Sequence, residues 1–493
     1  MQIGSLISRA ALHFGDAPCV TEDGRTLSFR EFDLATNRLA NALVERGLRP
    51  GDRVSVILPN SIECLIAYYA IAKAGLVRVQ LNTRETIENH RYKIADSGSP
   101  AVIHADIDGL EAEIAIAWDE LTEISLRGRA DPCCVELGLD DPVRLGYTGG
   151  TTGKPKGATS TTRILLVQLM AFLTDLVPDI RHNDVFLHAA PIAHASGAFF
   201  LPCLVRGAHS IIMQKFDAQK FVGLAVSSRA SMTFLVPTML AMILEVPGVE
   251  TADFCLRSIA YGASSISPNL MQRAERRFGR VFSQCYGQAE SPMVITCLKP
   301  EDHDRIGSCG RPFMVADVAI FGDDDKPLAS GETGEIVCRG PQVMAYYWGR
   351  REQTAEAFRN GWLHTGDIGY MDKDGFFYIV DRKNDLLISG GFNVYPREVE
   401  DVLLSYPGVV EAAVVGLPDE LWGDRVVAVV SGRPGLDADS LLAHARAHLA
   451  AYKRPKSVEI WPELPKSSAN KILRRVVRDK ILARPADMQG KSS

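Results

Sequence analysis

The sequence predicts an α/β protein with a large N-terminal domain of mostly parallel sheets covered by helices and a small α+β domain at the C-terminus. Its 493 residues are 46% hydrophobic and 23% charged, a globular composition with enough chain for two or three domains. Strand-like and helix-like segments alternate from residue 28 onward, as they do in a parallel sheet covered by helices. This texture changes after about residue 381, which indicates a second domain.

The first helix of this alternation has a marked beginning. Ser28 and Glu31 form a capping-box pattern, in which the serine oxygen accepts from a backbone amide and the glutamate reaches back. An amphipathic pattern follows as far as Gly47, which can end the helix in a left-handed conformation. The β-branched run 53–58 then predicts a strand, and residues 61–74 predict the next helix.

Prolines mark the beginnings of later helices. The strand-like run 234–236 precedes Pro237, and the run 256–261 is followed by Pro268 after a serine. Proline suits the first helical turn because its missing amide would have no partner there. These segments therefore continue the α/β order through the large domain.

The last part of the chain has a different order of elements. It predicts a helix at 396–404, two antiparallel strands at 409–417 and 425–431, a helix at 440–450 and a strand at 457–461. This order is typical of a small α+β domain of roughly 110 residues.

Composition excludes several classes of protein. Lys and Arg total 54 against 60 Asp and Glu, a net charge of −6, so no basic footprint for nucleic acid is present. The most apolar helical stretch, 164–177, is shorter than the roughly 18 residues of a membrane span and contains Gln168 and Asp175. The N-terminus lacks the pattern of a secretory signal, and the ten cysteines include no C-x-x-C pair. We therefore expect a cytoplasmic protein with reduced thiols, no transmembrane segment and no nucleic-acid partner.

The segment 147–157, YTGGTTGKPKG, follows a strand-like run at 143–147 and is typical of a phosphate-binding loop. Glycines let the backbone approach an anion, and threonine hydroxyls can contact phosphate oxygens. A Walker A motif is excluded because Thr148 replaces its first glycine and Pro155 replaces its final hydroxyl residue. From these residues alone, a glycine-rich hairpin turn remains an alternative.

Three further residues have types that nucleotide chemistry uses. Glu290 follows a strand-like run at 280–283 and could hold Mg²⁺ against a nucleotide. Asp367 follows a glycine turn and could accept from ribose hydroxyls, and Lys471 lies in a basic segment near the C-terminus. Each residue alone is equally consistent with a solvated surface side chain or an Asx-type turn.

Taken in order with 381–396 and 465–471, these segments resemble the acyl-adenylate-forming superfamily of acyl-CoA synthetases, luciferases and peptide-synthetase adenylation domains. The resemblance covers residues 24–475. It implies that ATP and a carboxylic acid form acyl-AMP and pyrophosphate, and that a thiol then attacks the acyl-AMP. ATP, Mg²⁺ and coenzyme A would be required. Residues 1–382 would form the adenylation domain with the ATP and acyl sites, and residues 383–493 the mobile domain with the catalytic lysine.

The resemblance also assigns roles to individual residues. It implies catalytic roles for Lys471, Glu290 and His194, with Glu290 binding the metal ion, and a hinge at Asn384. Coenzyme A would pass Gly390 and Gly391. The implied nucleotide-binding residues are Thr148, Gly149, Gly150, Thr151, Thr152, Gly153, Lys154, Lys156, Gly262, Ala263, Ser264, Tyr286, Gly287, Asp367 and Arg382. The implied acyl-pocket residues are His194, Phe199, Phe200, Tyr261, Cys285, Met293 and Val294.

Three positions depart from the family pattern. Ala289 stands where the family commonly has Thr, Asn470 where it commonly has Gly, and Asn384 where the hinge is commonly Asp or Lys. Asparagine tolerates positive φ better than most residues, so the loop geometry at Asn470 can survive. These departures bear on rate and on domain rotation, and they keep a nucleotide-binding pseudoenzyme open as an alternative.

The implied acyl pocket limits the substrate. Its positions are apolar and include no Arg or Lys to pair with a second carboxylate, which disfavours diacids. Phe200 stands where aryl-acid ligases tend to have a small residue, so we expect a medium- or long-chain aliphatic acid first and an aryl acid second. A peptide-synthetase domain is disfavoured because 189–201 contains no acidic residue. A non-CoA adenylating enzyme, a luciferase-like oxygenase and a homodimer stay open.

Overall fold

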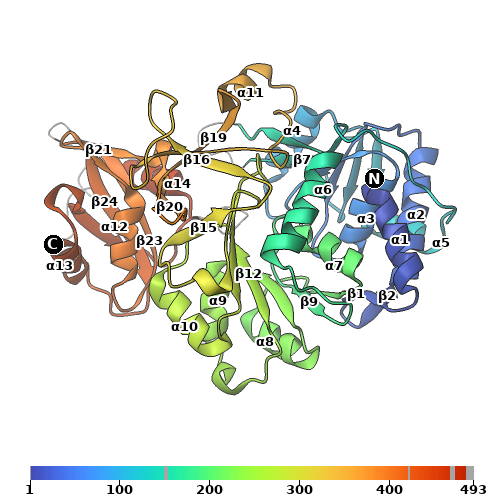
Figure 1. Cartoon of the computed structure of the whole chain (residues 1–493), viewed down its shortest axis with the longest axis horizontal. Coiled ribbons are helices and arrows are strands. Elements are labelled where there is room, and N and C mark those ends of the chain that lie inside the picture. Colours follow the sequence, from blue (N-terminus) through green and yellow to red (C-terminus); the bar gives the residue numbers. More distant parts are fainter. Residues whose placement is uncertain (1, 149–153, 420–421, 467–471, 485–493) are drawn as a thin grey trace.

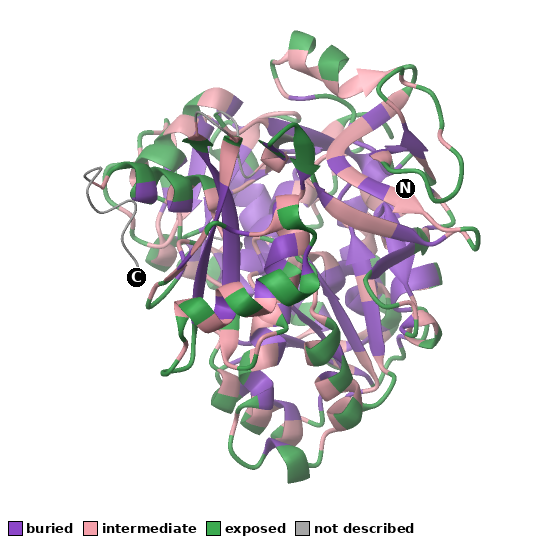
Figure 2. Cartoon of the chain, turned by 90° about the vertical axis from the view of Figure 1, so that its left-hand side faces the viewer, coloured by how far each residue is buried: buried purple, intermediate pink, exposed green. Residues whose placement is uncertain are grey.

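The structure, a computed structural model, describes residues 2–148, 154–419, 422–466 and 472–484. Figure 1 shows the N-terminal sheet with its helices at one end of the molecule and the C-terminal domain at the other, with the middle of the chain between them. Figure 2 shows strands that are largely buried beneath helices with exposed outer faces. The predicted α/β architecture with a smaller second domain is confirmed.

A six-stranded sheet occupies the N-terminal end, in the order β6-β5-β3-β4-β7-β8, and only the β7–β8 pair is antiparallel. Its strands are β3 (Arg53–Ile57), β4 (Val77–Gln80), β5 (Ala101–His104), β6 (Ile114–Ile116), β7 (Pro142–Tyr147) and β8 (Gly157–Thr161). The helices of this region are α1 (Ile3–Phe14), α2 (Phe29–Glu45), α3 (Ile62–Lys73), α4 (Ile87–Ser97), α5 (Trp118–Arg127) and α6 (Thr162–Ala171), and α6 continues into a π-helical turn, η1 (Phe172–Leu176).

A second, larger sheet begins parallel. Its parallel strands are β1 (Pro18–Glu22), β10 (His209–Ile212), β9 (Val185–His188), β11 (Met232–Leu235), β12 (Ser258–Gly262) and β13 (Phe282–Tyr286), and β2 (Arg25–Ser28) pairs antiparallel with β1. Helices α7 (Phe200–Arg206), α8 (Ala218–Ser227), α9 (Pro237–Leu244) and α10 (Pro268–Phe278) and the short segments η2 (Ser196–Phe199) and η3 (Val249–Thr251) connect these strands.

The same sheet becomes antiparallel after β13, which the alternation of strands and helices did not predict. This part contains β14 (Thr296–Leu298), β15 (Ser308–Pro312), β16 (Asp317–Phe321), β17 (Gly334–Arg339), β18 (Phe358–Arg359), β19 (Trp362–Met371) and β20 (Phe377–Arg382). The η4 turn (Pro300–Asp302) and α11 (Arg351–Ala357) are its only other described elements. It carries the chain from the parallel strands to the C-terminal domain (Figure 1).

The C-terminal domain contains a five-stranded sheet with hydrophobic clusters of its own. Its strands are β21 (Leu387–Ser389), β22 (Phe392–Val394), β23 (Val409–Asp419), β24 (Gly423–Gly432) and β25 (Ser457–Ile460). Its helices are α12 (Pro396–Leu404), α13 (Ala438–His448) and α14 (Arg474–Leu482), with short turns η5 (Lys383–Asp385) and η6 (Ala451–Lys453). The predicted antiparallel pair is confirmed as β23 and β24. The division at residues 382 and 383 stays a prediction.

The local sequence signals explain where these elements begin and end. The Glu31 amide donates to Oγ of Ser28 at 3.2 Å, and the Ser28 amide donates to the Glu31 carboxylate at 2.8 Å, which confirms the capping box. Gly47 has φ 94° beyond the end of α2, as the sequence predicted. Pro237 and Pro268 are the first residues of α9 and α10.

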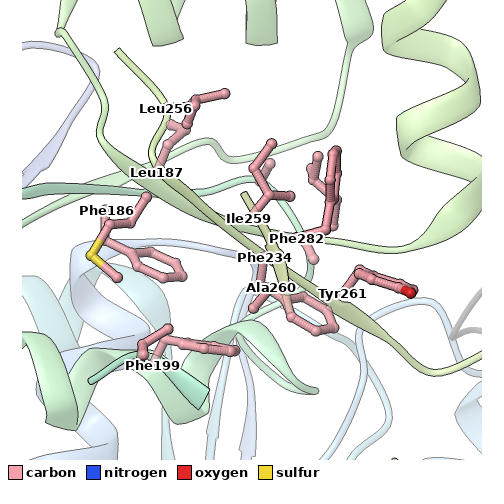
Figure 3. Close-up of a cluster of buried hydrophobic side chains, with 14 of the residues drawn as sticks. Phe186, Leu187, Phe199, Phe234, Leu256, Ile259, Ala260, Tyr261 and Phe282 are labelled. Atoms are coloured by element: carbon pink, nitrogen blue, oxygen red, sulfur yellow. The ribbon is translucent and has the colours of Figure 1, made fainter. Parts of the chain in front are cut away.

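The two largest hydrophobic clusters of the described residues lie in the large domain. The first lies around β9, β11, β12 and β13 and is called here the Phe199 cluster (Figure 3). The second packs α1, α2 and α3 together and includes Phe200. All ten cysteines are free thiols, and no described helix is both long enough and apolar enough to cross a bilayer.

Ser28→Ala should lower the free energy of unfolding by about 1 kcal/mol, because the Glu31 amide loses its acceptor. Urea unfolding of the whole chain measures this change. Ser28→Thr keeps a hydroxyl at the cap and is the matched control. Equal stability of the Ala and Thr variants would contradict a stabilising role for the capping box.

Candidate active site

The base of the predicted phosphate loop is a hairpin between β7 and β8. The Thr148 amide donates to the Lys156 carbonyl at 3.0 Å, and the Lys156 amide donates to Oγ1 of Thr148 at 3.2 Å. The Lys156 ammonium lies 4.3 Å from the centre of the Tyr347 ring, and the Lys154 ammonium lies 5.5 Å from that of Tyr92. Two cations therefore lie in the described part of the predicted loop that leads into β8. The predicted residues Gly149, Gly150, Thr151, Thr152 and Gly153 lie outside the described residues.

A buried carboxylate lies where β19 and β20 meet the end of β13. Asp367 is 5% exposed, and its Cα is paired with that of Arg382 on the neighbouring strand. The Tyr286 hydroxyl and the Gln288 amide donate to Oδ2 of Asp367 at 2.6 and 2.7 Å. The Arg382 Nε lies 3.4 Å from the other oxygen, Oδ1. Burial and the charge of Asp367 raise the pKa of Tyr286 well above its usual range, so this hydroxyl remains a donor.

Glu290, the predicted metal ligand, is held by the segment that contains Met344 and Tyr347. The Tyr347 hydroxyl donates to Oε1 of Glu290 at 2.5 Å, and the Met344 amide donates to the Glu290 carbonyl at 2.6 Å. Burial and Glu290 raise the pKa of Tyr347, which keeps it protonated. The Lys156 ammonium lies over the ring of Tyr347, so this tyrosine contacts both the phosphate loop and the Glu290 carboxylate.

The ends of β12 and β13 approach each other closely at two glycines. Gly262 pairs with Cys285, and a Cβ atom at Gly262 would lie 2.5 Å from the Cys285 carbonyl oxygen. At Gly287 a Cβ atom would lie 2.4 Å from the Met293 amide nitrogen. Only glycine fits at such positions. The predicted nucleotide-binding residues Ala263 and Ser264 follow Gly262 and are exposed.

The residues proposed for the acyl pocket divide into two groups. Tyr261, Cys285 and Val294 are buried in the Phe199 cluster, and Met293 packs against it. Figure 3 shows Phe199 and Tyr261 on this cluster. Phe200 faces the other way: its ring centre lies 5.2 Å from that of Phe32 and 5.3 Å from that of Tyr69, in the second cluster.

His194 lies at a separate cavity. Its Nε2 lies 2.6 Å from the amide nitrogen of Asn82. The cavity has a volume of about 60 Å³ and lies between α1, α3, α6 and the six-stranded sheet. Its polar lining includes Arg78 and Arg144, which the sequence analysis did not consider.

Three carboxylates converge on one arginine at the predicted hinge. Nη1 of Arg474 donates to Asp381 and to Asp385 at 2.8 Å each, and its Nη2 donates to Glu400 at 2.7 Å. Asn384 lies between the two aspartates in η5. Helix α14 is thereby connected to the chain on both sides of Asn384.

The proposed CoA-lining glycines form the turn between β21 and β22. Gly390 and Gly391 have φ 59° and 79°, and the Gly390 amide donates to the Trp422 carbonyl at 2.7 Å. The predicted catalytic Lys471 lies outside the described residues.

The described residues that are predicted to bind the nucleotide form two contact groups. Asp367 and Arg382 meet the end of β13 through Tyr286, and Glu290 meets the phosphate loop through Tyr347. Sequence reasoning missed the contacts of Gln288 and Tyr347, because their partners are distant along the chain. Gln288 lies between the predicted residues Gly287 and Glu290 but had no role assigned, and Tyr347 lies outside the motifs.

Comparison with known proteins agrees with this geometry. The profile of the family described as AMP-binding enzyme matches residues 7–348. The profile described as AMP-binding enzyme C-terminal domain matches residues 398–471.

Two characterised proteins are similar over most of the chain. A feruloyl-CoA synthase from an Amycolatopsis species is 40% identical over 487 residues, which cover 97% of this chain and 98% of that protein. The medium/long-chain-fatty-acid–CoA ligase FadD8 from Mycobacterium tuberculosis is 36% identical over 468 residues, which cover 88% of this chain and 82% of that protein.

Solved structures share the fold and differ in arrangement. ATP-bound MatB from Rhodopseudomonas palustris superimposes with a TM-score of 0.90 at 28% identity, covering 98% of this chain and 99% of that one. Apo MatB from the same organism gives a TM-score of 0.78 at 30% identity, covering 97% of this chain and 99% of that one. The arrangement of this chain is therefore closer to the ATP-bound form.

Asp367→Ala should weaken ATP binding about 10²- to 10⁴-fold, because two hydrogen bonds from the ribose to a charged group are lost and each contributes about 1.5–3 kcal/mol. Titration calorimetry with ATP and with a carboxylic acid separates the effect, since acid binding should change little. Arg311→Ala is a control, because Arg311 is an exposed arginine elsewhere on the antiparallel strands. Unchanged ATP affinity in a folded Asp367 variant would remove Asp367 from the site.

Proposed function

This chain belongs to the AMP-binding enzyme family and is an AMP-forming acyl-CoA synthetase, and we propose that its substrate is an aromatic carboxylic acid. In the first step a carboxylate oxygen attacks the α-phosphorus of ATP, and pyrophosphate leaves. In the second step the sulfur of coenzyme A attacks the acyl carbon, the thiol loses its proton, and AMP leaves.

The observations that support adenylation most directly are the two contact groups around Asp367 and Glu290. The fixed orientation of Asp367 suits it to accept from both ribose hydroxyls. Lys154 and Lys156 supply positive charge beside the loop that would hold the phosphates.

A magnesium ion fits this site as part of the nucleotide complex. Mg²⁺ prefers one or two carboxylates together with phosphate oxygens and water. Glu290 offers one half-buried carboxylate oriented by Tyr347. The described residues contain no group of three or more metal-ligating side chains, which agrees with an ion held largely by phosphates. When bound, the ion would neutralise charge on the phosphates.

The packing of Phe199 supports an aromatic substrate, and the position of Phe200 removes an objection to one. Sequence reasoning disfavoured aryl acids because Phe200 was expected in the acyl pocket. The ring of Phe200 lies in the other cluster, so this argument no longer applies. The ring of Phe199 lies 5.1 Å from that of Phe186 and 5.5 Å from that of Phe234, and such rings pack well against another aromatic group.

A medium- or long-chain aliphatic acid is the second candidate. It is favoured by the uniformly apolar composition of the Phe199 cluster and by the similarity to a fatty-acid–CoA ligase.

A panel of acids distinguishes the two candidates. Thioester formation with ferulate, benzoate, octanoate and palmitate should give the best aryl acid a kcat/KM at least tenfold above that of the best fatty acid. Phe199→Leu should reduce kcat/KM for the aryl acid more than for octanoate, whereas Phe200→Leu, the matched control, should change the ratio little. A preference for octanoate or palmitate would contradict the aromatic proposal.

Lys471→Ala should slow adenylation by about 10²–10³-fold, because the family role aims its ammonium at charge that develops on the α-phosphate. ATP–pyrophosphate exchange measures this step, and thioester formation from supplied acyl-AMP measures the second step. The second step should be nearly unchanged if the small domain has rotated away. Lys466→Ala is the control, since Lys466 is paired with Glu411 instead. Equal losses in both steps would contradict rotation.

A further inference from the structure

Two arginines face each other across neighbouring strands of the six-stranded sheet. The Cα atoms of Arg78 on β4 and Arg144 on β7 are direct partners in the parallel register. Side chains at paired positions point to the same face of a sheet, and like charges placed there destabilise it. A fold that keeps such a pair needs something to offset the repulsion.

The partners of these arginines within the chain are weak. Nη2 of Arg144 donates to Oγ of Ser160 at 3.0 Å, and the guanidinium of Arg78 lies 4.0 Å from the centre of the Tyr68 ring. The Nε atoms of both arginines are buried and have no hydrogen-bond partner among the described residues. In the described parts of the chain, neither guanidinium lies within 4.0 Å of a carboxylate oxygen.

The Arg144 side chain remains a cation at neutral pH. Burial and the neighbouring charge of Arg78 lower the pKa of Arg144 to about 9, which is still above 7. Both arginines are half-buried, and a cation that loses part of its hydration is normally paired. The cross-strand pair therefore has unused capacity for a negatively charged partner.

The cavity beside the pair can admit such a partner. Its volume of about 60 Å³ exceeds the roughly 10–15 Å³ that one water molecule requires. Its lining combines the charged or polar side chains of Arg78, Arg144 and His194 with the apolar side chains of Leu165, Leu169 and Leu201. This combination suits a carboxylate at the end of an apolar stem.

The cavity also adjoins the candidate acyl site. His194 lines it directly, and so do Gly197 and Ala198, which precede Phe199. Across the cavity, Gln168 of α6 donates from Nε2 to the Pro292 carbonyl at 2.7 Å, next to Met293. Elements that build the cavity thus also support the residues proposed to hold the acyl group.

We propose that this cavity binds an oxyanion, a carboxylate in the first instance, between the guanidinium groups of Arg78 and Arg144. The anion has two sources to distinguish: a second carboxylate at the far end of the acyl substrate, or a free anion. The first source rests on the proposed function, whereas binding of the anion itself does not. It also reverses the sequence expectation that no arginine is available for a diacid.

The test uses pairs of acids that differ only in a second carboxylate, such as hexanoate with adipate and octanoate with suberate. Thermal unfolding of the full chain is measured with each acid and with inorganic phosphate, at ionic strength matched with sodium chloride. ATP–pyrophosphate exchange is measured with the same acids. The variants are Arg78→Gln and Arg144→Gln. The control is Arg163→Gln. It removes an equal charge from α6, where Arg163 forms an exposed ion pair with Asp140.

We expect at least one diacid or phosphate to raise the unfolding temperature more than its matched monoacid or sodium chloride does. This extra shift should fall by half or more in both cavity variants and stay in Arg163→Gln. Without anion, the cavity variants should be at least as stable as the unmodified chain, because one of two repelling charges is gone, whereas a purely structural arginine would lose stability.

Exchange identifies the source of the anion. A diacid preferred at least tenfold over its monoacid, with the preference abolished in Arg144→Gln, assigns the anion to the substrate. A stability shift without that preference assigns it to a free anion. Equal shifts for all pairs in the unmodified chain would overturn the proposal and leave water in the cavity, even if neither variant folds. Absence of exchange with all of these acids and also with ferulate and benzoate, together with a stability shift, would contradict the proposed function alone.

Discussion

The carboxylate of Asp367 is held by donors from separate parts of the chain, and the geometry of the site depends on this contact. Tyr286 and Gln288 lie at the end of the parallel strands, and Arg382 is the last residue of β20. A buried carboxylate is tolerated only when its oxygens are satisfied, so these donors must stay in place. The contact therefore fixes the antiparallel strands against the parallel ones at the edge where the nucleotide is expected.

The same constraint reaches the second domain. Arg382 is followed at once by η5. Asp381, which precedes Arg382, and Asp385, the last residue of η5, both accept hydrogen bonds from Arg474 of α14. Burial alone would favour the neutral form of Glu400 and raises its pKa, but the bidentate contact with Arg474 opposes this. A rotation of the small domain would have to preserve or exchange these contacts. The closer match to ATP-bound than to apo MatB agrees with an arrangement suited to the first half-reaction.

Local patterns in the sequence predicted much of the fold. The capping box at Ser28 and the helix starts at Pro237 and Pro268 depend on neighbours a few residues away, and the structure has them where expected. The antiparallel strands after residue 296 were not predicted, because few helices separate them and their pairing is non-local. The site was predicted only through motifs that resemble a family. Tyr347 lies outside these motifs and Gln288 lies within one without an assigned role, and their places at the site follow from contacts across 57 and 79 residues.

The arginine pair shows why a pocket cannot be assigned from a run of apolar residues. Residues 143–147 were treated as an apolar strand, although Arg144 lies within them. Its partner, Arg78, is 66 positions earlier, and only the parallel register of β4 and β7 places them together. A crossover of this length carries no local signal for register. Phe199 and Phe200 make the converse point, because two consecutive residues of one type face different cores. Substrate selectivity therefore depends on sheet register and on the direction of single side chains, and both are properties of the folded chain.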